Sequence, residues 1–223
     1  MKAIVISGGE LHRSFFKEYF DKYGKEACII CVDGALLALE EMGICPEYAV
    51  GDFDTLKNEE LLEKYRQRGV KILRHNPVKN ASDTELAMEL CRDAGFLDIT
   101  LLGALGRRMD HALANLFLLS RYEAENIRLS LLDPWNHIYT KSASFSIQKD
   151  LAWGNYFSLF TLEGPVENVS ISGAAYPLRQ KKLDSSLYPS LTISNKILEK
   201  EARITFSQGR LLVVESRDLP LSP

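Results

Sequence analysis

Aspartate residues follow several short apolar runs of this chain, and their positions suggest metal and phosphate chemistry. Asp33 follows one apolar run, and Asp52 and Asp54 follow another in the stretch GDFDT. Asp83 and Asp110 each stand near the start of a segment with helical spacing. If the apolar runs are parallel strands, all five carboxylates gather at the carboxyl edge of one sheet, where open α/β folds bind ligands.

Such a gathering of acids predicts a divalent cation. Each close pair of carboxylates costs about 1–4 kcal/mol at 4 Å for effective dielectric constants of 80 down to 20. A hard cation removes this repulsion, and ligands that are all oxygen favour Mg²⁺. In an extended GDFDT segment, Asp52 and Asp54 point to the same side and Phe53 points into the packing. Asp83 and Asp110 could instead serve only as helix N-caps, and the residues alone leave both interpretations open.

Glycine and basic residues share this expected edge and suit phosphate oxygens. Gly103 and Gly106 flank a tight loop that Arg107 and Arg108 follow directly, and Lys79 precedes the acid of the next segment. The sequence contains neither GxxxxGK[ST] nor GxGxxG, which excludes a P-loop and a standard dinucleotide-binding turn. Magnesium, phosphate and a site of another type together indicate nucleotide-dependent phosphoryl or pyrophosphoryl transfer.

The elements that must position these side chains alternate between strand and helix. This alternation predicts βαβ units, and therefore a Rossmann-like, mostly parallel sheet with helices on both faces. His111 follows Asp110 on one predicted helix, about 100° away around its axis, so we expect a structural or supporting role for it. The strands are expected at 3–6, 27–32, 48–50, 70–73, 99–102 and 127–132, and the helices at 11–24, 35–43, 58–69, 82–95 and 109–125.

After Asp133 and Pro134 the pattern changes to short, often alternating segments rich in Ser, Thr, Phe and Val. With turn signals between them, these segments predict an all-β domain, a sandwich or a barrel. We therefore expect an α/β catalytic domain at 1–136 and a β-sandwich domain at 140–223. Its strands are expected at 142–148, 155–162, 166–172, 190–195, 201–206 and 210–216.

Composition limits the classes of partner. The 223 residues are 46% hydrophobic, which excludes wholesale disorder, and 27 basic against 30 acidic residues give a net charge of −3, which argues against a nucleic-acid partner. No window approaches about 18 apolar residues and no signal peptide is evident, so we expect a cytoplasmic protein that does not enter membranes. Cys28 and Cys31 lie in an apolar run and point to opposite faces, which favours buried thiols over a metal site.

The ordered motifs resemble those of the thiamine pyrophosphokinase family. GDFDT, SDTELA and GALGRRMDHALAN follow one another in the first part, and Gly173–Leu178 and Thr192–Asn195 match motifs of the second part. The resemblance implies an α/β domain followed by a β-sandwich. It also implies a homodimer that converts thiamine and ATP to thiamine diphosphate and AMP with Mg²⁺, the thiamine site lying near the dimer interface.

The resemblance also implies roles for individual residues. Three positions depart from the family pattern: Asn80, Arg107 and Lys196 stand where a Lys-Asp pair, a second glycine and an acid are usual. By position, Asp52, Asp54, Asp83 and Asp110 would be catalytic, with the first three holding the metal; Asp33, Lys79 and Arg108 would contact ATP; and Tyr176, Ser194 and Asn195 would contact thiamine.

Two other functions remain open at this point. A pyrophosphokinase for another hydroxymethyl heterocycle, such as a pterin, would share the ATP half and differ in the β-domain pocket. A non-catalytic thiamine or nucleotide sensor would keep the fold and lose the chemistry. The presence of all four motif aspartates argues against the sensor, because binding alone would tolerate their loss.

Overall fold

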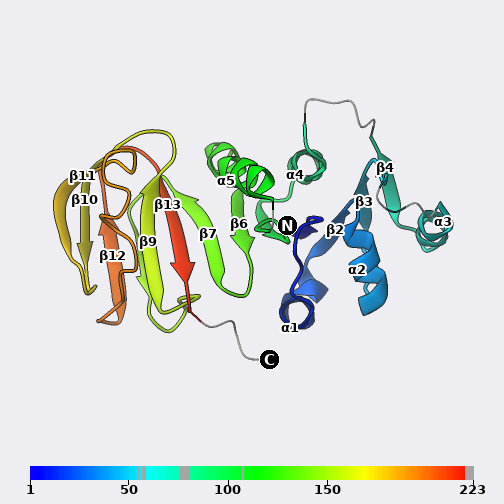
Figure 1. Cartoon of the computed structure of the whole chain (residues 1–223), viewed down its shortest axis with the longest axis horizontal. Coiled ribbons are helices and arrows are strands. Elements are labelled where there is room, and N and C mark those ends of the chain that lie inside the picture. Colours follow the sequence, from blue (N-terminus) through cyan, green and yellow to red (C-terminus); the bar gives the residue numbers. More distant parts are fainter. Residues whose placement is uncertain (55, 57–58, 76–80, 107, 219–223) are drawn as a thin grey trace. The chain divides into compact units, whose positions relative to one another are not determined.

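The structure is a computed structural model and describes residues 1–54, 56, 59–75, 81–106 and 108–218. The chain divides into two compact units (Figure 1). The first comprises Met1–Leu118 and Ala124–Asp133, and the second comprises Leu119–Glu123 and Pro134–Ser222.

The first unit is built on a parallel sheet. Among the described residues its strands follow the order β4-β3-β2-β1-β5-β6, and every neighbouring pair is parallel. The order reverses at β1, which is flanked by β2 and β5, so the topological switch point lies there. The strands are β1 (Lys2–Ile6), β2 (Cys28–Val32), β3 (Tyr48–Gly51), β4 (Lys71–Arg74), β5 (Asp98–Leu102) and β6 (Arg128–Leu132).

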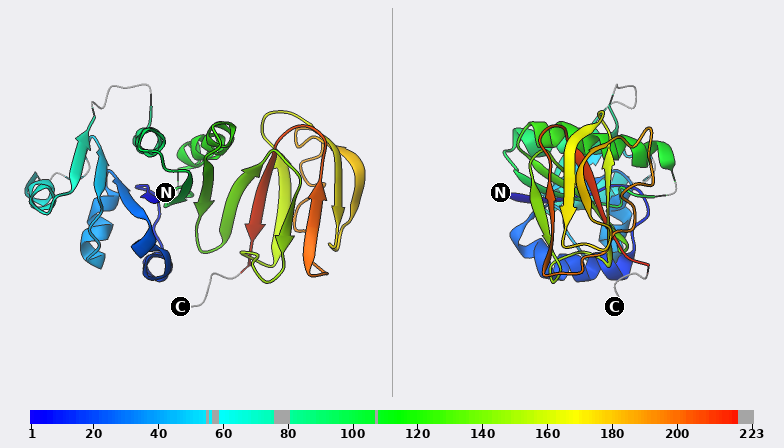
Figure 2. Two further views of the ribbon diagram at one scale, coloured as in Figure 1. Left: turned by 180° about the vertical axis from the view of Figure 1, so that it is seen from behind. Right: turned by 90° about the vertical axis from the view of Figure 1, so that its left-hand side faces the viewer.

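Helices cover both faces of this sheet, as expected from the sequence. In the two opposite views, α1 and α2 lie on one face, and α4 and α5 lie on the other (Figures 1 and 2). The central strands are buried between them, and Val5, Ile30 and Leu101 are fully inaccessible. The helices are α1 (Arg13–Tyr23), the 3₁₀ turn η1 (Gly24–Glu26), α2 (Ala35–Met42), α3 (Glu59–Gln67), α4 (Asp83–Asp93) and α5 (Met109–Ala124).

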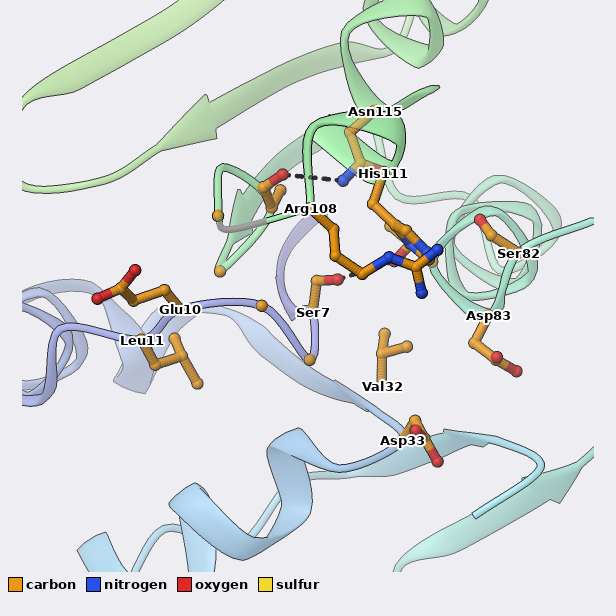
Figure 3. A pocket seen from close by; sticks show the side chains of 16 residues that line it. Ser7, Glu10, Leu11, Val32, Asp33, Ser82, Asp83, Arg108, His111 and Asn115 are labelled. Carbon is orange, nitrogen blue, oxygen red and sulfur yellow. Dashed lines mark hydrogen bonds between the residues drawn. The ribbon is translucent and has the colours of Figure 1, made fainter. Parts of the chain in front are cut away.

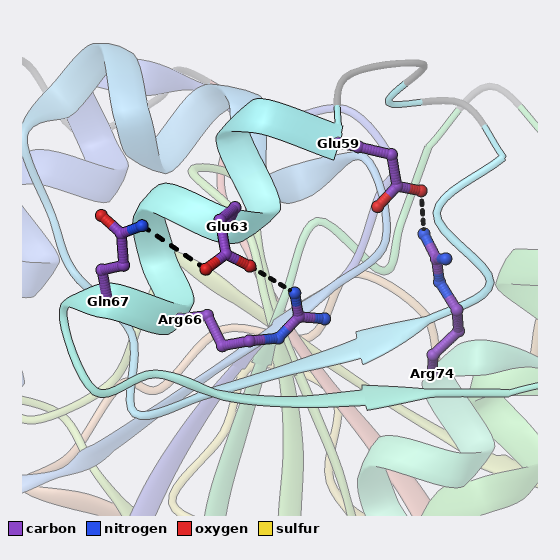
Figure 4. Close-up of polar contacts among 5 residues, drawn as sticks. All are labelled: Glu59, Glu63, Arg66, Gln67 and Arg74. Atoms are coloured by element: carbon purple, nitrogen blue, oxygen red, sulfur yellow. Dashed lines mark hydrogen bonds and ion pairs between the residues drawn. The ribbon is translucent and has the colours of Figure 1, made fainter.

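Helix α3 is held mainly by apolar packing, and surface ion pairs add little. Leu61, Leu62 and Tyr65 have helical spacing and are buried on its inner face. On its outer side, Glu59 accepts a hydrogen bond from Arg74 of β4 at 2.5 Å (Figure 4). Because these outer groups are solvent-exposed, their ion pairs contribute at most about 1 kcal/mol each.

The second unit is an antiparallel β-sandwich. One sheet has β13 paired with β7 and β9, and the other has the order β11-β10-β12-β8. Apolar side chains from both sheets, including Phe157, Leu159, Val169 and Ile204, form one core. The strands are β7 (Asn136–Lys141), β8 (Phe145–Gln148), β9 (Tyr156–Thr161), β10 (Val166–Ser172), β11 (Leu178–Leu183), β12 (Glu201–Thr205) and β13 (Leu211–Ser216).

The structure overturns one of the expected strands in this unit and adds two others. The segment 190–195 was predicted to be a strand, but it forms turns, and only Asn195 makes an isolated bridge, to Phe157. Strands β7 and β11 were not predicted. β11 is an edge strand with four exposed polar or charged residues, so it lacks the apolar alternation of a covered strand.

A buried glutamate on β13 accepts hydrogen bonds from β7 and from the loop before β9. Glu215 on β13 is 5% exposed, and its carboxylate accepts hydrogen bonds from the Tyr139 hydroxyl at 2.9 Å and the Trp153 backbone N–H at 2.8 Å. His137 Nδ1 lies 3.7 Å from the same carboxylate. Burial by itself would raise the pKa of Glu215, but these contacts outweigh burial and hold the pKa below its ordinary value.

Burial was expected for Cys28 and Cys31; Cys31 is buried, whereas Cys28 is only half-buried and Cys45 is exposed. All four are free, and Cys31 and Cys91 are buried. Burial raises the pKa of Cys28 to about 11 and that of Cys91 to about 12. In the part of the chain that the structure describes, no helix combines the length and apolarity needed to cross a membrane.

Candidate active site

A pocket of about 770 Å³ lies at the carboxyl ends of β1, β2 and β5, at the switch point of the parallel sheet (Figure 3). Its wall combines polar and apolar surface and is contributed by the loops after these strands and by the first turns of α4 and α5. The lining residues are Ser7, Gly8, Gly9, Glu10, Leu11, Val32, Asp33, Ser82, Asp83, Thr84, Gly103, Ala104, Gly106, Arg108, His111 and Asn115.

Two glycine loops meet at one side of this pocket. The Gly9 N–H donates to the Gly103 carbonyl at 3.1 Å, which continues the β1–β5 ladder beyond the strands. A Cβ on Gly9 would lie 2.2 Å from that carbonyl oxygen, and Gly103 adopts φ +65°. Only glycine permits both the close approach and the left-handed conformation, so these loops present backbone to the pocket.

The N-terminus of α4 forms a second side. Ser82 is the N-cap, and its hydroxyl accepts from the Glu85 N–H at 3.1 Å. The open possibility that Asp83 serves as the cap is therefore excluded, and its carboxylate lines the pocket instead. The buried Thr84 hydroxyl lies 2.9 Å from the Ser7 hydroxyl, which joins α4 to the loop after β1. A helix N-terminus at the wall of a pocket favours an anionic ligand.

Three aspartates converge at the edge of the pocket. Oxygens of Asp33, Asp52 and Asp54 all lie within 4.8 Å of one another. Asp33 also lines the pocket, so the acidic cluster adjoins it. This donor set of carboxylate oxygens fits Mg²⁺.

The local conformation of the cluster differs from the sequence prediction. GDFDT was expected to be extended, but β3 ends at Gly51 and Phe53 is left-handed, with φ +59°. The chain turns there, and the Asp54 N–H donates to Asp52 Oδ1 at 3.1 Å. Phe53 is buried, as predicted, at 4% exposure. The two carboxylates are thus brought together by a turn and not by strand alternation.

The start of α5 presents Arg108 and His111 to the pocket. Asp110 is not among the described lining residues; it accepts hydrogen bonds from Arg108 Nε at 3.2 Å and Nη2 at 2.5 Å. This pairing lowers the pKa of Asp110. His111, expected to have only a supporting role, lines the pocket because α5 begins at Met109 and turns that side chain inward. Lys79, Asn80 and Arg107 lie outside the described residues.

The three residues expected to contact thiamine lie together in the second unit. Asn195 is 1% exposed, and its amide both donates to the Tyr176 carbonyl at 2.8 Å and accepts from the Tyr176 N–H at 2.9 Å. Tyr176 is thereby held with its side chain 67% exposed. Ser194 is left-handed, with φ +54°, and its N–H donates to Ser158 Oγ at 3.0 Å. Asn195 thus holds the backbone that presents Tyr176.

The sequence interpretation did not select Ser7, Thr84 or Asn115 as site residues. Ser7 and Thr84 gave no signal, because their hydroxyl pair joins residues 77 positions apart. Asn115 did give one: it is a polar residue within the buried stripe of α5 that includes Ala112 and Leu119.

Fold and site together define an open α/β protein with a ligand pocket at its switch point, joined to a β-sandwich. Comparison with known families makes this more specific. The family model described as thiamin pyrophosphokinase, catalytic domain, matches residues 20–131. The model described as thiamin pyrophosphokinase, vitamin B1 binding domain, matches residues 143–211. The chain belongs to the thiamin pyrophosphokinase family.

Individual relatives agree with this assignment. A protein named thiamine pyrophosphokinase from Bacillus subtilis is 28% identical over 220 residues, which cover 98% of this chain and 100% of the relative. Crystal structures of thiamine pyrophosphokinases from B. subtilis and Geobacillus thermodenitrificans superimpose with TM-scores of 0.85 and 0.82 at 25% and 26% identity. Each covers 98% of this chain, and the two alignments span 100% and 98% of the solved chains. The predicted fold class, a parallel sheet with flanking helices followed by a β-sandwich, is confirmed.

Proposed function

We propose that this protein transfers a pyrophosphoryl group from ATP to the hydroxyl of thiamine, giving thiamine diphosphate and AMP. The observation that carries this proposal is the pocket at the switch point with the Asp33–Asp52–Asp54 cluster at its edge. It occurs in a chain whose two parts match the catalytic and vitamin B1 binding models of one family. We assign the ATP and Mg²⁺ functions to residues 1–136 and thiamine binding to residues 140–223.

The acidic cluster is our candidate for the Mg²⁺ site. Asp52 and Asp54 would hold the ion with Asp33, whose oxygens lie within the same 4.8 Å group. Asp83, which lines the same pocket as Asp33, would complete the ligand set. Bound Mg²⁺ would neutralise charge on the transferred phosphates.

The remaining pocket residues suit the phosphate chain of ATP. Arg108 supplies a guanidinium that Asp110 holds through two hydrogen bonds, and Asp83 and Thr84 in the first turn of α4 line the same pocket, where the helix dipole favours an anion. We expect Lys79 to add a further cation. In the reaction, the thiamine oxygen attacks the β-phosphorus and the bond from that phosphorus to the α-phosphate oxygen breaks. One of Asp52, Asp54, Asp83 and Asp110 would accept the hydroxyl proton.

Tyr176 is our candidate for the aromatic contact to thiamine. Its ring is largely exposed while its backbone is fixed by Asn195 on both the N–H and the carbonyl. An exposed ring on a fixed backbone can stack on a flat heterocycle. Ser194 directly precedes Asn195 in the chain and would line the same site.

We also propose a homodimer and a cytoplasmic location. Large apolar side chains of the second unit, including Leu187, Tyr188 and Leu198, are more than 60% exposed, which is typical of a surface that another chain covers. The four free thiols fit a reducing compartment. Size-exclusion chromatography with light scattering tests the dimer.

The experiment that tests the function compares AMP release with thiamine and with pterin alcohols as acceptors. We expect AMP to form with ATP, Mg²⁺ and thiamine, and not with the pterin alcohols. In the variant Tyr176→Ala, the KM for thiamine should rise by more than the KM for ATP. AMP release with a pterin alcohol alone would assign the other pyrophosphokinase activity, and thiamine binding without AMP release would indicate a sensor.

A further inference from the structure

Asn115 occupies a position of α5 where its neighbours on the same face are apolar, apart from His111 at the pocket end of that face. Ala112, Leu119 and Tyr122, which lie three, four and seven positions away, are all buried, and Asn115 itself is 4% exposed. The side chain nevertheless lines the pocket at the switch point. A polar residue therefore stands where the helix pattern calls for an apolar one.

Two general effects oppose asparagine at this place. Asparagine is a poorer helix former than leucine or alanine, and a buried amide destabilises the fold unless it is hydrogen-bonded. The amide satisfies this requirement outside its own helix. Its Nδ2 donates to the carbonyl oxygen of Ala104 at 3.0 Å (Figure 3). Because a carbonyl only accepts, the bond also fixes which end of the amide faces the loop.

The loop that receives this bond connects β5 to α5 and carries the pocket wall. Its first two carbonyls each accept a hydrogen bond from another segment, that of Gly103 from the Gly9 N–H at 3.1 Å and that of Ala104 from Asn115. Gly103 is left-handed, and because glycine is conformationally permissive these bonds restrict the loop more than its own backbone does. The loop then leads to Arg108 at the start of α5.

We propose that Asn115 is a positioning residue for the nucleotide, because it holds the loop 103–106 in the shape that receives the phosphate chain. The inference rests on the proposed function, since it takes a nucleoside triphosphate as the ligand of this pocket. Asn115 acts through the loop backbone and through Arg108. Its removal should weaken binding of ATP, and thiamine binding should change little.

The test uses two substitutions at this position. Asn115→Leu has nearly the same size and suits both the apolar stripe and the helix, but it cannot donate to Ala104. Asn115→Asp keeps the shape and also cannot donate when ionised. Both should raise the KM for ATP about tenfold or more, because a hydrogen bond to a buried carbonyl is lost, with the KM for thiamine within twofold of wild type. Titration with Mg-ATP in the absence of thiamine should show the same loss of affinity.

Ser120 provides a matched control on the same helix. It is 3% exposed, and its hydroxyl has no hydrogen-bond partner among the described residues. Ser120→Ala should leave both KM values unchanged. Equal increases in both KM values for the Asn115 variants, or an unchanged affinity for Mg-ATP in either folded variant, would overturn the proposal.

The outcomes for the site and for the function are separable. If the wild-type protein binds Mg-ATP but releases no AMP with thiamine, the proposed function fails, while the titrations of the Asn115 variants still decide the positioning role. If the wild-type protein does not bind Mg-ATP, the positioning role is refuted as well.

Discussion

The variant Asp52→Asn should show how much the repulsion within the acidic cluster destabilises the metal-free protein, separately from the role of the cluster in binding Mg²⁺. Asp52 is half-buried, and its Oδ1 accepts the Asp54 N–H, a bond that the amide oxygen of asparagine can keep. The substitution therefore removes one charge and preserves the local turn. It relieves two of the three repulsive pairs in a cluster whose oxygens lie within 4.8 Å of one another.

The magnitude follows from Coulomb's law. For a water-like dielectric constant, each pair at this separation is worth about 0.9 kcal/mol, so the metal-free variant should be more stable than wild type by about 1.7 kcal/mol. For a chain of this length that corresponds to a rise in Tm of about 3–7 °C. The gain should shrink in 1 M salt, where the Debye length is about 3 Å.

Magnesium should reverse the order of stabilities. An ion at about 100 times its Kd stabilises the wild-type protein by about 2.7 kcal/mol, and the variant should lose most of this gain together with turnover. Thermal unfolding in EDTA and in Mg²⁺, with AMP release measured in parallel, tests both parts. Asp150→Asn, in an exposed turn of the second unit, is the matched control and should change neither the thermal stability nor the release of AMP. Equal stabilisation of wild type and Asp52→Asn by Mg²⁺ would refute the assignment of the metal to this cluster.

Three further predictions address the loops, the sandwich and the thiols. Gly9→Ala should destabilise the protein by about 1–3 kcal/mol in urea unfolding, because its Cβ would meet the Gly103 carbonyl. Gly8→Ala should be as stable as wild type, because the nearest atom to its Cβ, the Val32 carbonyl oxygen, would lie 3.9 Å away. Equal stabilities of the two variants would contradict the close approach at Gly9. The pKa of Glu215 in the folded protein lies below its unfolded value, so Glu215 stabilises the fold above about pH 4.3, and this stability is lost as pH falls through the folded pKa. Glu215→Gln should therefore make stability less dependent on pH in the acid range. An unchanged pH dependence would contradict this role of Glu215. With a thiol reagent at pH 8, Cys45, the exposed thiol, should react fast, the half-buried Cys28 more slowly, and the buried Cys31 and Cys91 only on unfolding. Fast reaction of Cys31 or Cys91 would contradict their burial.

The first unit could be predicted closely because its central strands are covered on both faces. Such strands appear in the sequence as continuous apolar runs, and each predicted run became a strand of the parallel sheet. Helical spacing between them then fixed the topology, and topology placed the acids at one edge. Asp33, Asp52 and Asp54 were brought together in this way although the first is 19 residues from the second.

The second unit was less predictable because its strands are exposed on one face or lie at an edge. β11 reads as a charged segment, with Arg179, Lys181 and Lys182 exposed. The segment 190–195 alternates apolar and polar residues as a strand does, yet the left-handed Ser194 and the bonds of Asn195 to the Tyr176 backbone make it a turn. These long-range contacts have no local sequence signal.

Within the site, the sequence indicated which residues take part better than it indicated where their side chains point. The left-handed conformation of Phe53 is rare for a residue other than glycine, and no local pattern indicates it. Likewise, whether Asp110 or His111 faces the pocket depends on the residue at which α5 begins, which periodicity places only within a few positions.

The most direct test of the central claim is the stoichiometry of products from ATP and thiamine in the presence of Mg²⁺. Chromatographic separation of the nucleotides and thiamine esters should show one AMP for each thiamine diphosphate, with no AMP when thiamine is omitted. Formation of ADP with thiamine monophosphate, or of AMP without thiamine diphosphate, would contradict pyrophosphoryl transfer to thiamine.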